Sequence, residues 1–168
     1  MGDSIPRTAG SGRRRNAAVA WGLVAVQAAL IIVILVVPVG DAWPLTPVVA
    51  AGSTALTWAG IGLLVWAIAV FGRGVTPSPL PSQKAQLRTR GPYRWIRHPM
   101  YTGVIMLMTG AMLDRRSWLA ATLWVILVGF LVAKARWEEQ RLVETYPDYA
   151  EYRETVSAFV PTLGRTPS

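Results

Sequence analysis

Long uninterrupted apolar runs set the strongest limit on how this chain folds. Residues 17–37 are apolar apart from Gln27, and residues 47–71 form a second run of similar character. Twenty-one helical residues at about 1.5 Å each match a hydrocarbon core of about 30 Å. A cleaved signal peptide is the alternative for the first run, but that run is longer than an h-region and no small-x-small cleavage site follows it. Both runs are therefore predicted to be transmembrane helices.

A shorter pair of apolar segments follows later in the chain. Residues 100–113 are apolar, residues 114–116 read as a tight turn, and residues 117–133 form another apolar helix that continues to Glu138 and Glu139. The pattern predicts a helical hairpin whose second arm overshoots the first by roughly two turns, or about 10 Å. The overall expectation is an all-α polytopic membrane protein with about four embedded helices: two spans and the hairpin.

The charge distribution indicates topology. The 168 residues carry a formal net charge of +8, which in a soluble protein would suggest nucleic-acid binding. Here the basic residues gather before the first run and between the second and third runs, and such clusters mark the cytoplasmic side. We therefore expect no nucleic-acid partner, and both termini and any active site on the cytoplasmic face of what is predicted to be a bacterial plasma membrane.

The remaining composition divides the chain into four regions. Residues 1–16 are polar and basic and are predicted to be a disordered tail. Residues 17–71 hold the two spans, residues 72–162 hold the candidate site, and residues 163–168 are a frayed tail. Within the third region, residues 72–81 are rich in proline and predict an extended linker. Residues 147–156 predict a short helix whose tyrosines face either the membrane interface or the hairpin.

Reactive residue types crowd into one stretch, residues 91–101, which contains the only histidine and leads directly into the third apolar run. The hairpin geometry predicts that Glu138 and Glu139 rise beside it. Each residue alone has an ordinary explanation, since boundary arginines often snorkel to lipid headgroups. Ionisable residues that converge at a membrane face nevertheless indicate function. With no cysteine and a single histidine, no metal site is expected.

These residues carry a family resemblance. The pattern Gly91-Pro92-Tyr93-x-x-x-Arg97-His98-Pro99-x-Tyr101-x-Gly103, followed by Glu138-Glu139-x-x-Leu142 and Tyr149-x-x-Tyr152-Arg153, resembles the isoprenylcysteine carboxyl methyltransferase and phospholipid methyltransferase superfamily. The resemblance covers roughly residues 72–162. It implies a membrane enzyme that uses S-adenosylmethionine, with a cytosol-facing cofactor pocket formed by this stretch and by the helix that carries the glutamates.

The residue types suit that cofactor. A glutamate can accept from its amino group or ribose, Arg97 and His98 can donate to its carboxylate, and Tyr93, Trp95 and Tyr101 can supply aromatic walls. Whether Arg97 serves the cofactor or the substrate stays open at the level of sequence. The predicted catalytic residues are Arg97 and Glu139; the predicted cofactor-binding residues are Pro92, Tyr93, Arg97, His98, Pro99, Tyr101, Glu138 and Glu139.

The expected acceptor is a lipophilic or amphipathic molecule, with a carboxylate as the first expectation. For a carboxylate, an arginine would orient the attacking oxygen, whereas a lipid amine would need a proton acceptor such as a glutamate or His98. Two other functions compete: a sterol-type NADPH-dependent reductase, which shares a similar His-Pro-x-Tyr-x-Gly region, and a non-catalytic lipid-binding scaffold. The sequence leaves the oligomeric state open.

Overall fold

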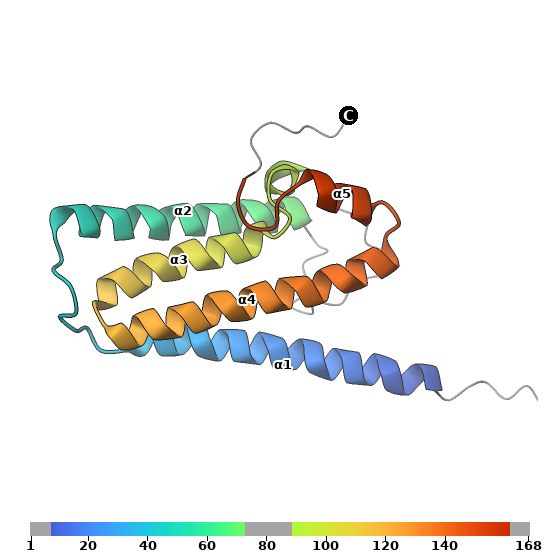
Figure 1. Ribbon diagram of the computed structural model, residues 1–168, viewed down its shortest axis with the longest axis horizontal. Helices are drawn as coiled ribbons and strands as arrows, with labels where there is room; N and C mark the ends of the chain where they lie inside the picture. Colours follow the sequence, from blue (N-terminus) through green and yellow to red (C-terminus); the bar gives the residue numbers. More distant parts are fainter. Residues whose placement is uncertain (1–7, 73–88, 162–168) are drawn as a thin grey trace, which may run out of the picture.

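The computed structural model describes residues 8–72 and 89–161, and these residues form a layered helical bundle (Figure 1). The elements, in chain order, are α1 (Thr8–Val36), α2 (Pro47–Phe71), the 3-10 helix η2 (Gly91–Arg94), α3 (Pro99–Arg115), α4 (Trp118–Thr145) and α5 (Tyr149–Thr155). The predicted all-α class is confirmed.

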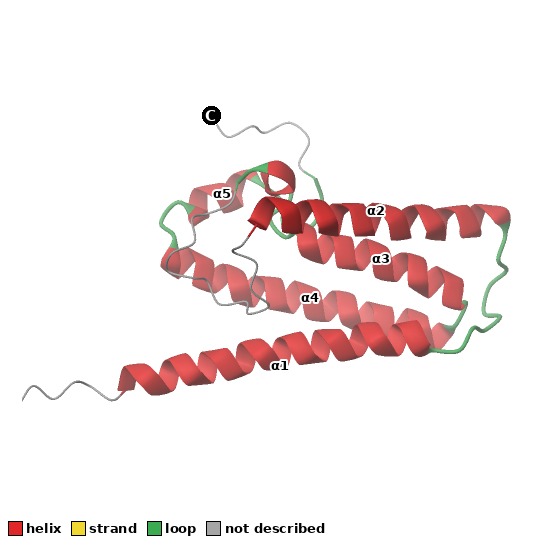
Figure 2. Ribbon diagram, turned by 180° about the vertical axis from the view of Figure 1, so that it is seen from behind, coloured by secondary structure: helices red, strands yellow, loops and turns green. Residues whose placement is uncertain are grey.

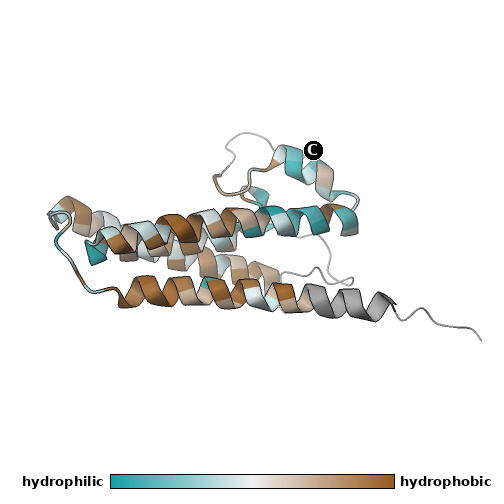
Figure 3. Ribbon diagram, turned by 60° about the horizontal axis from the view of Figure 1, so that its bottom comes forward, coloured by the Kyte–Doolittle hydropathy of each residue, from teal (hydrophilic) through white to brown (hydrophobic). Residues whose placement is uncertain are grey.

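Within the described residues, three helices are long and apolar enough to cross a membrane, namely α1 from Ala17, α2 and α4. Large apolar side chains on these helices are exposed, among them Ile32 at 57%, Val48 at 81% and Trp58 at 68%. Figure 3 shows the apolar character along these helices. Exposed apolar surface on this scale fits contact with lipid rather than water. With 17 residues, α3 spans only about 25 Å, in agreement with the predicted short arm.

The first helix is longer than predicted. It begins at Thr8, so the disorder predicted for residues 1–16 is wrong for residues 8–16, while residues 1–7 lie outside the described residues. Helix nucleation is the costly step, so a span that is already helical can extend by adding residues at its end. No proline interrupts residues 8–16. The predicted proline-rich linker lies almost entirely outside the described residues, as do residues 162–168.

The hairpin has the predicted asymmetry. Helix α3 ends at Arg115, Arg116 takes the left-handed conformation at φ 51°, and α4 begins at Trp118. Because α4 has 28 residues against 17 in α3, it extends about 11 residues, or about 16 Å, past the start of α3. The pair Glu138 and Glu139 lies on this extension, close to the level of the residues that precede α3.

Close packing joins α2 to α3. A Cβ atom on Gly60 would lie 2.6 Å from the backbone nitrogen of Leu107 and 2.7 Å from the backbone oxygen of Gly103, so the two backbones approach too closely for a larger residue. Small residues recur along α2 at positions 51, 55 and 59, with Gly52, Gly60 and Gly62 nearby, and such a face permits the close approach of another helix. The partner is α3, and the contact uses Gly60; the alanines of that face are exposed: Ala51, Ala55 and Ala59.

The loop between α1 and α2 and the turn between α3 and α4 lie at the same end of the bundle, opposite the start of α1 (Figure 2), and polar contacts join them. The Trp43 indole donates to the Leu113 carbonyl at 3.1 Å, and Arg116 Nε donates to the Trp43 carbonyl at 2.7 Å. The Ser53 hydroxyl donates to the Asp114 carboxylate at 2.5 Å. The two bonds of Trp43 hold the loop between α1 and α2 against the end of α3 and the turn that follows it, and the Ser53 bond joins α2 to α3.

Candidate functional site at the far end of the hairpin

The motif stretch begins with a tight backbone turn against α2. Gly91 has φ 61°, and a Cβ atom there would lie 2.7 Å from a Val70 methyl group. Only glycine fits both the positive φ and the close approach. Pro92 follows as the second residue of the 3-10 helix and is fully buried, which fixes the backbone that leads to Tyr93.

The next residues are held by the C-terminal segment. Arg97 N donates to the Ser157 carbonyl at 2.9 Å, and His98 N donates to the Ala158 carbonyl at 3.0 Å. Pro99 begins α3 directly after His98 and is fully buried. The segment that follows α5 therefore runs beside the Arg-His-Pro sequence and fixes the direction of its side chains.

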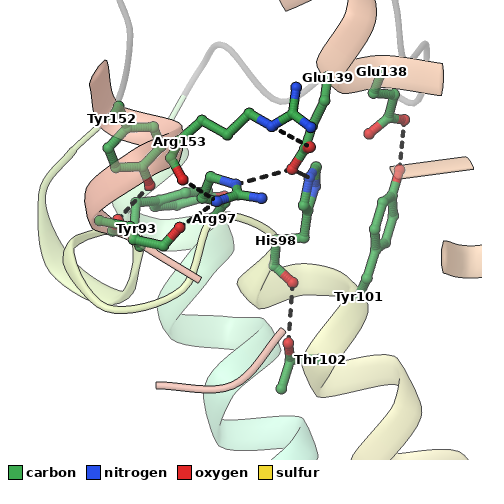
Figure 4. A network of polar contacts seen from close by, with 10 residues as sticks. Tyr93, Arg97, His98, Tyr101, Thr102, Glu138, Glu139, Tyr152 and Arg153 are labelled. Atoms are coloured by element: carbon green, nitrogen blue, oxygen red, sulfur yellow. Dashed lines mark hydrogen bonds and ion pairs between the residues drawn. The ribbon is translucent and has the colours of Figure 1, made fainter. Parts of the chain in front are cut away.

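Glu139 gathers three basic side chains (Figure 4). Its Oε1 accepts from Arg97 Nε at 2.9 Å and lies 3.0 Å from His98 Nε2. Its other oxygen lies 3.6 Å from Arg153 Nε. The Glu139 and Arg97 side chains are only 7% and 10% exposed. Both charged groups are largely removed from water, so their mutual attraction at this distance replaces solvation that each has lost.

Arg97 also forms hydrogen bonds with the backbone of the C-terminal segment. Its NH1 donates to the backbone carbonyls of Arg153, at 2.7 Å, and Val156. With Nε on Glu139 and NH1 on two carbonyls, the guanidinium joins three parts of the chain: the stretch before α3, helix α4 and the end of α5. It is the structural centre of this site.

Glu138 has different surroundings from its neighbour. Its Oε1 accepts from the Tyr101 hydroxyl at 2.5 Å, and the ion pairs of the described residues do not include it. Lys134, one turn earlier on α4, lies with Nζ 5.1 Å from the centroid of the Tyr101 ring. Its ammonium donates to Gln27 Oε1 on α1 at 2.7 Å. The two glutamates thus differ: Glu139 is fully engaged, whereas one oxygen of Glu138 is left to accept from another group.

Aromatic rings enclose His98. The Tyr101 ring stacks on it with centroids 5.5 Å apart and an interplanar angle of 6°, and Phe159 lies on it at 5.8 Å and 27°. Trp95, which was expected to form a wall, instead packs against Trp66 at 5.7 Å and is 43% exposed. It lies on the outer surface of the site.

Tyr93 combines burial with an unused hydroxyl. The side chain is buried, and its hydroxyl has no hydrogen-bond partner within the part of the chain that the structure describes. Its carbonyl accepts from the Tyr152 hydroxyl. Burial raises the pKa of Tyr93, because the charged phenolate would lose its solvation. The hydroxyl therefore stays protonated and is available to donate.

The structure brings the predicted site residues together and adds others. Residues 92, 93, 97, 98, 99 and 101 lie on one continuous stretch, and Arg97, His98 and Tyr101 bond directly to the two glutamates. Sequence analysis did not assign Lys134, Gln27 or Phe159 to the site. Two signals could have identified the first two: Gln27 is the only polar residue in its apolar run, and Lys134 stands four residues before Glu138.

Membrane-crossing helices that carry a buried network of charges at one end define an integral membrane protein with a polar site at its boundary. Comparison with known proteins specifies the class. The phospholipid methyltransferase family matches residues 48–149, and the chain belongs to that family, which lies within the superfamily that the motifs resemble.

One curated relative is the nickel-cobalt-cadmium resistance protein NccN of Alcaligenes xylosoxydans xylosoxydans. The two sequences are 31% identical over 127 residues, which cover 73% of this chain and 54% of the relative. The chain therefore spans about half the length of that relative.

Proposed function

We propose that this protein is an integral-membrane methyltransferase that uses S-adenosylmethionine and methylates a lipophilic or amphipathic acceptor. The observation that carries the proposal is the convergence of Arg97, His98 and Tyr101 on the paired glutamates inside the segment that matches the family. When bound, S-adenosylmethionine supplies an electrophilic methyl group on a sulfonium.

The available groups suit such a cofactor. Glu138 keeps a free oxygen that can accept from an amino group or a ribose hydroxyl, and the Tyr93 hydroxyl can donate to a carboxylate. The aromatic rings of Tyr101 and Phe159 beside His98 provide apolar surface for a flat ring. The residues present therefore fit an amphipathic cation that carries both donors and acceptors.

Arg97 and Glu139, the predicted catalytic pair, are proposed to act mainly by positioning. The Arg97 guanidinium and the Glu139 carboxylate form an ion pair with each other, and together they hold His98 and the end of α5 in place. A transfer of this kind depends on alignment and on exclusion of water more than on a protein nucleophile. Their contribution is thus a fixed frame, while Glu138, Tyr93 and the His98 ring face the ligand.

The site is proposed to face the cytoplasm. The N-terminal end of α1, the motif stretch and α5 all lie at the same end of the bundle (Figure 1), and described basic residues of the motif stretch, the end of α4 and α5 lie there: Arg90, Arg94, Arg97, Arg141 and Arg153. An acceptor with an apolar tail would reach this end from the lipid, with its polar end at the interface.

Ligand binding by purified protein in detergent tests the proposal. Isothermal titration should show saturable S-adenosylmethionine binding that is weakened about 10-fold or more in Glu138→Gln, because a hydrogen bond to a charged group is lost. Glu144→Gln is the matched control, since Glu144 is exposed on the same helix. Absence of binding in the unmodified protein, or binding of NADPH instead, would overturn the proposal.

A radiolabelled-methyl transfer assay with membrane lipid extract then identifies the acceptor. A labelled ester would indicate a carboxylate acceptor, and a labelled alkylamine would indicate a lipid amine. Failure to label any lipid, prenyl or small-acid pool, despite cofactor binding, would contradict the transferase reaction.

A further inference from the structure

Lys134 is a buried cation that forms no direct ion pair with a carboxylate of the described residues, although the Glu138 carboxylate one turn later on α4 attracts it through space. It is 5% exposed, and its ammonium donates to the neutral amide of Gln27 at 2.7 Å. The ion pairs of the described residues are those of Arg97, His98 and Arg153 with Glu139. Among the described residues, Lys134 is thus a buried basic side chain whose ammonium contacts a neutral amide and the face of the Tyr101 ring, 5.1 Å from its centroid, but no carboxylate.

The hydrogen-bonding groups that remain on the Lys134 and Gln27 pair are mostly donors, since only the second lone pair of Gln27 Oε1 is left to accept. An ammonium has three donors and no acceptor, so Gln27 must turn its oxygen toward Lys134. Its amide NH2 group then points away, and no described residue accepts from it. Two ammonium N–H groups and two amide N–H groups remain, together with a positive charge. The chemistry complementary to this set is an anionic oxygen group.

A simple tether between α1 and α4 does not require a charge at this depth. Two neutral side chains would form the same link without the cost of burying an ammonium. An anion would supply both a directly contacting negative charge and acceptors for the remaining N–H groups. We propose that Lys134 and Gln27 form an intramembrane anion-binding subsite for the acidic head, a carboxylate or a phosphate, of an amphipathic ligand.

The subsite adjoins the proposed methyl-transfer site. Lys134 Nζ lies over the Tyr101 ring, and the Tyr101 hydroxyl bonds to Glu138. Lys134 is one turn nearer the apolar part of α4 than Glu138, so an acid held there keeps its tail among the spans. Arg97, the alternative cation, already has its Nε and NH1 bound within the protein.

The identity of this ligand as the methyl acceptor rests on the proposed function. For a carboxylate acceptor, one oxygen forms a bond to the methyl carbon while the bond from that carbon to the donor sulfur breaks, and the bonding pair stays on sulfur. The negative and positive charges cancel, and no proton moves. Gln27 lies outside the family-matched residues 48–149, so this contact would be an addition that α1 makes to the family's site.

Lysine-selective 13C NMR tests the subsite directly, because the chain has only two lysines, Lys84 and Lys134. The full-length protein in dodecyl maltoside would be titrated with dodecanoate, dodecyl phosphate and the uncharged dodecanamide, with Lys84→Arg used to assign the signals. We expect a saturable shift of the Lys134 resonance with at least one anion and none with the amide. The two anions distinguish a carboxylate ligand from a phosphate ligand. No shift with either anion, or an equal shift with the amide, would overturn the proposal.

Gln27→Glu separates an anion site from a tether. The new carboxylate still accepts from Lys134 and strengthens the link between α1 and α4, so the thermal midpoint should stay equal or rise. It also neutralises the ammonium, so anion affinity should fall about 10-fold or more. Unchanged anion affinity in this variant would show that the pair is only a tether. Titration of the same sample with S-adenosylmethionine tests the proposed function separately.

Discussion

Replacing the Glu139 carboxylate by an amide should loosen the whole site. In Glu139→Gln one shared acceptor oxygen remains for Arg97 and His98, which lie 2.9 Å and 3.0 Å from it, but the negative charge is lost. The substitution keeps the size and shape of the side chain, so the expected effects arise from charge and hydrogen bonding rather than from a cavity.

The magnitude follows from burial. Removing one partner of a buried ion pair costs about 3 to 5 kcal/mol, because the other charge stays buried. The remaining amide oxygen retains part of one hydrogen bond, so we expect a loss of about 2 to 4 kcal/mol in the free energy of unfolding. The contact to Arg153 adds little, since that side chain is 55% exposed and screened by solvent.

Unfolding in mixed micelles of dodecyl maltoside and sodium dodecyl sulfate measures this loss, with Glu144→Gln as the control. Hydrogen exchange gives a local readout. The Arg97 and His98 amides donate to the carbonyls of Ser157 and Ala158, and they should exchange faster in Glu139→Gln as the C-terminal segment loosens. Amides in the interior of α3 should change less. A free energy of unfolding within about 0.5 kcal/mol of the control, with unchanged exchange, would refute this account of Glu139.

Three further substitutions test the frame that holds the site. Gly60→Ala should destabilise the protein by about 1 to 3 kcal/mol through overpacking between α2 and α3, while Gly62→Ala, with no atom within 4 Å of the added Cβ, should not; equal unfolding midpoints would contradict the close contact. Tyr152→Phe removes the donor to the buried Tyr93 carbonyl and should cost about 1 to 2 kcal/mol in the same assay, with no loss expected if that bond does not form. Ser53→Ala removes the 2.5 Å bond to a carboxylate on α3 and should cost about 1.5 to 3 kcal/mol, and an unchanged midpoint would argue against it.

The membrane class, the span boundaries and the hairpin could be predicted because each depends on local pattern. The second span was predicted over the same residues as α2, 47–71, since proline starts it and polar residues follow it. Helix lengths fixed the overshoot of α4 and so brought Glu138 and Glu139 beside His98. The predicted disorder was wrong for residues 8–16, because composition does not reveal how far a stable helix propagates beyond its apolar part.

The sequence by itself determined that this chain crosses a membrane and that its reactive residues collect at one boundary, because hydropathy and helical rise are local properties. Only the tertiary structure decided which partner each of those residues contacts. Glu138 and Glu139 are adjacent in sequence, but successive helical residues point about 100° apart. One therefore meets Arg97 and His98, while the other meets Tyr101. The contact between Lys134 and Gln27, 107 positions apart, likewise depends on how α1 packs on α4, which no local pattern specifies.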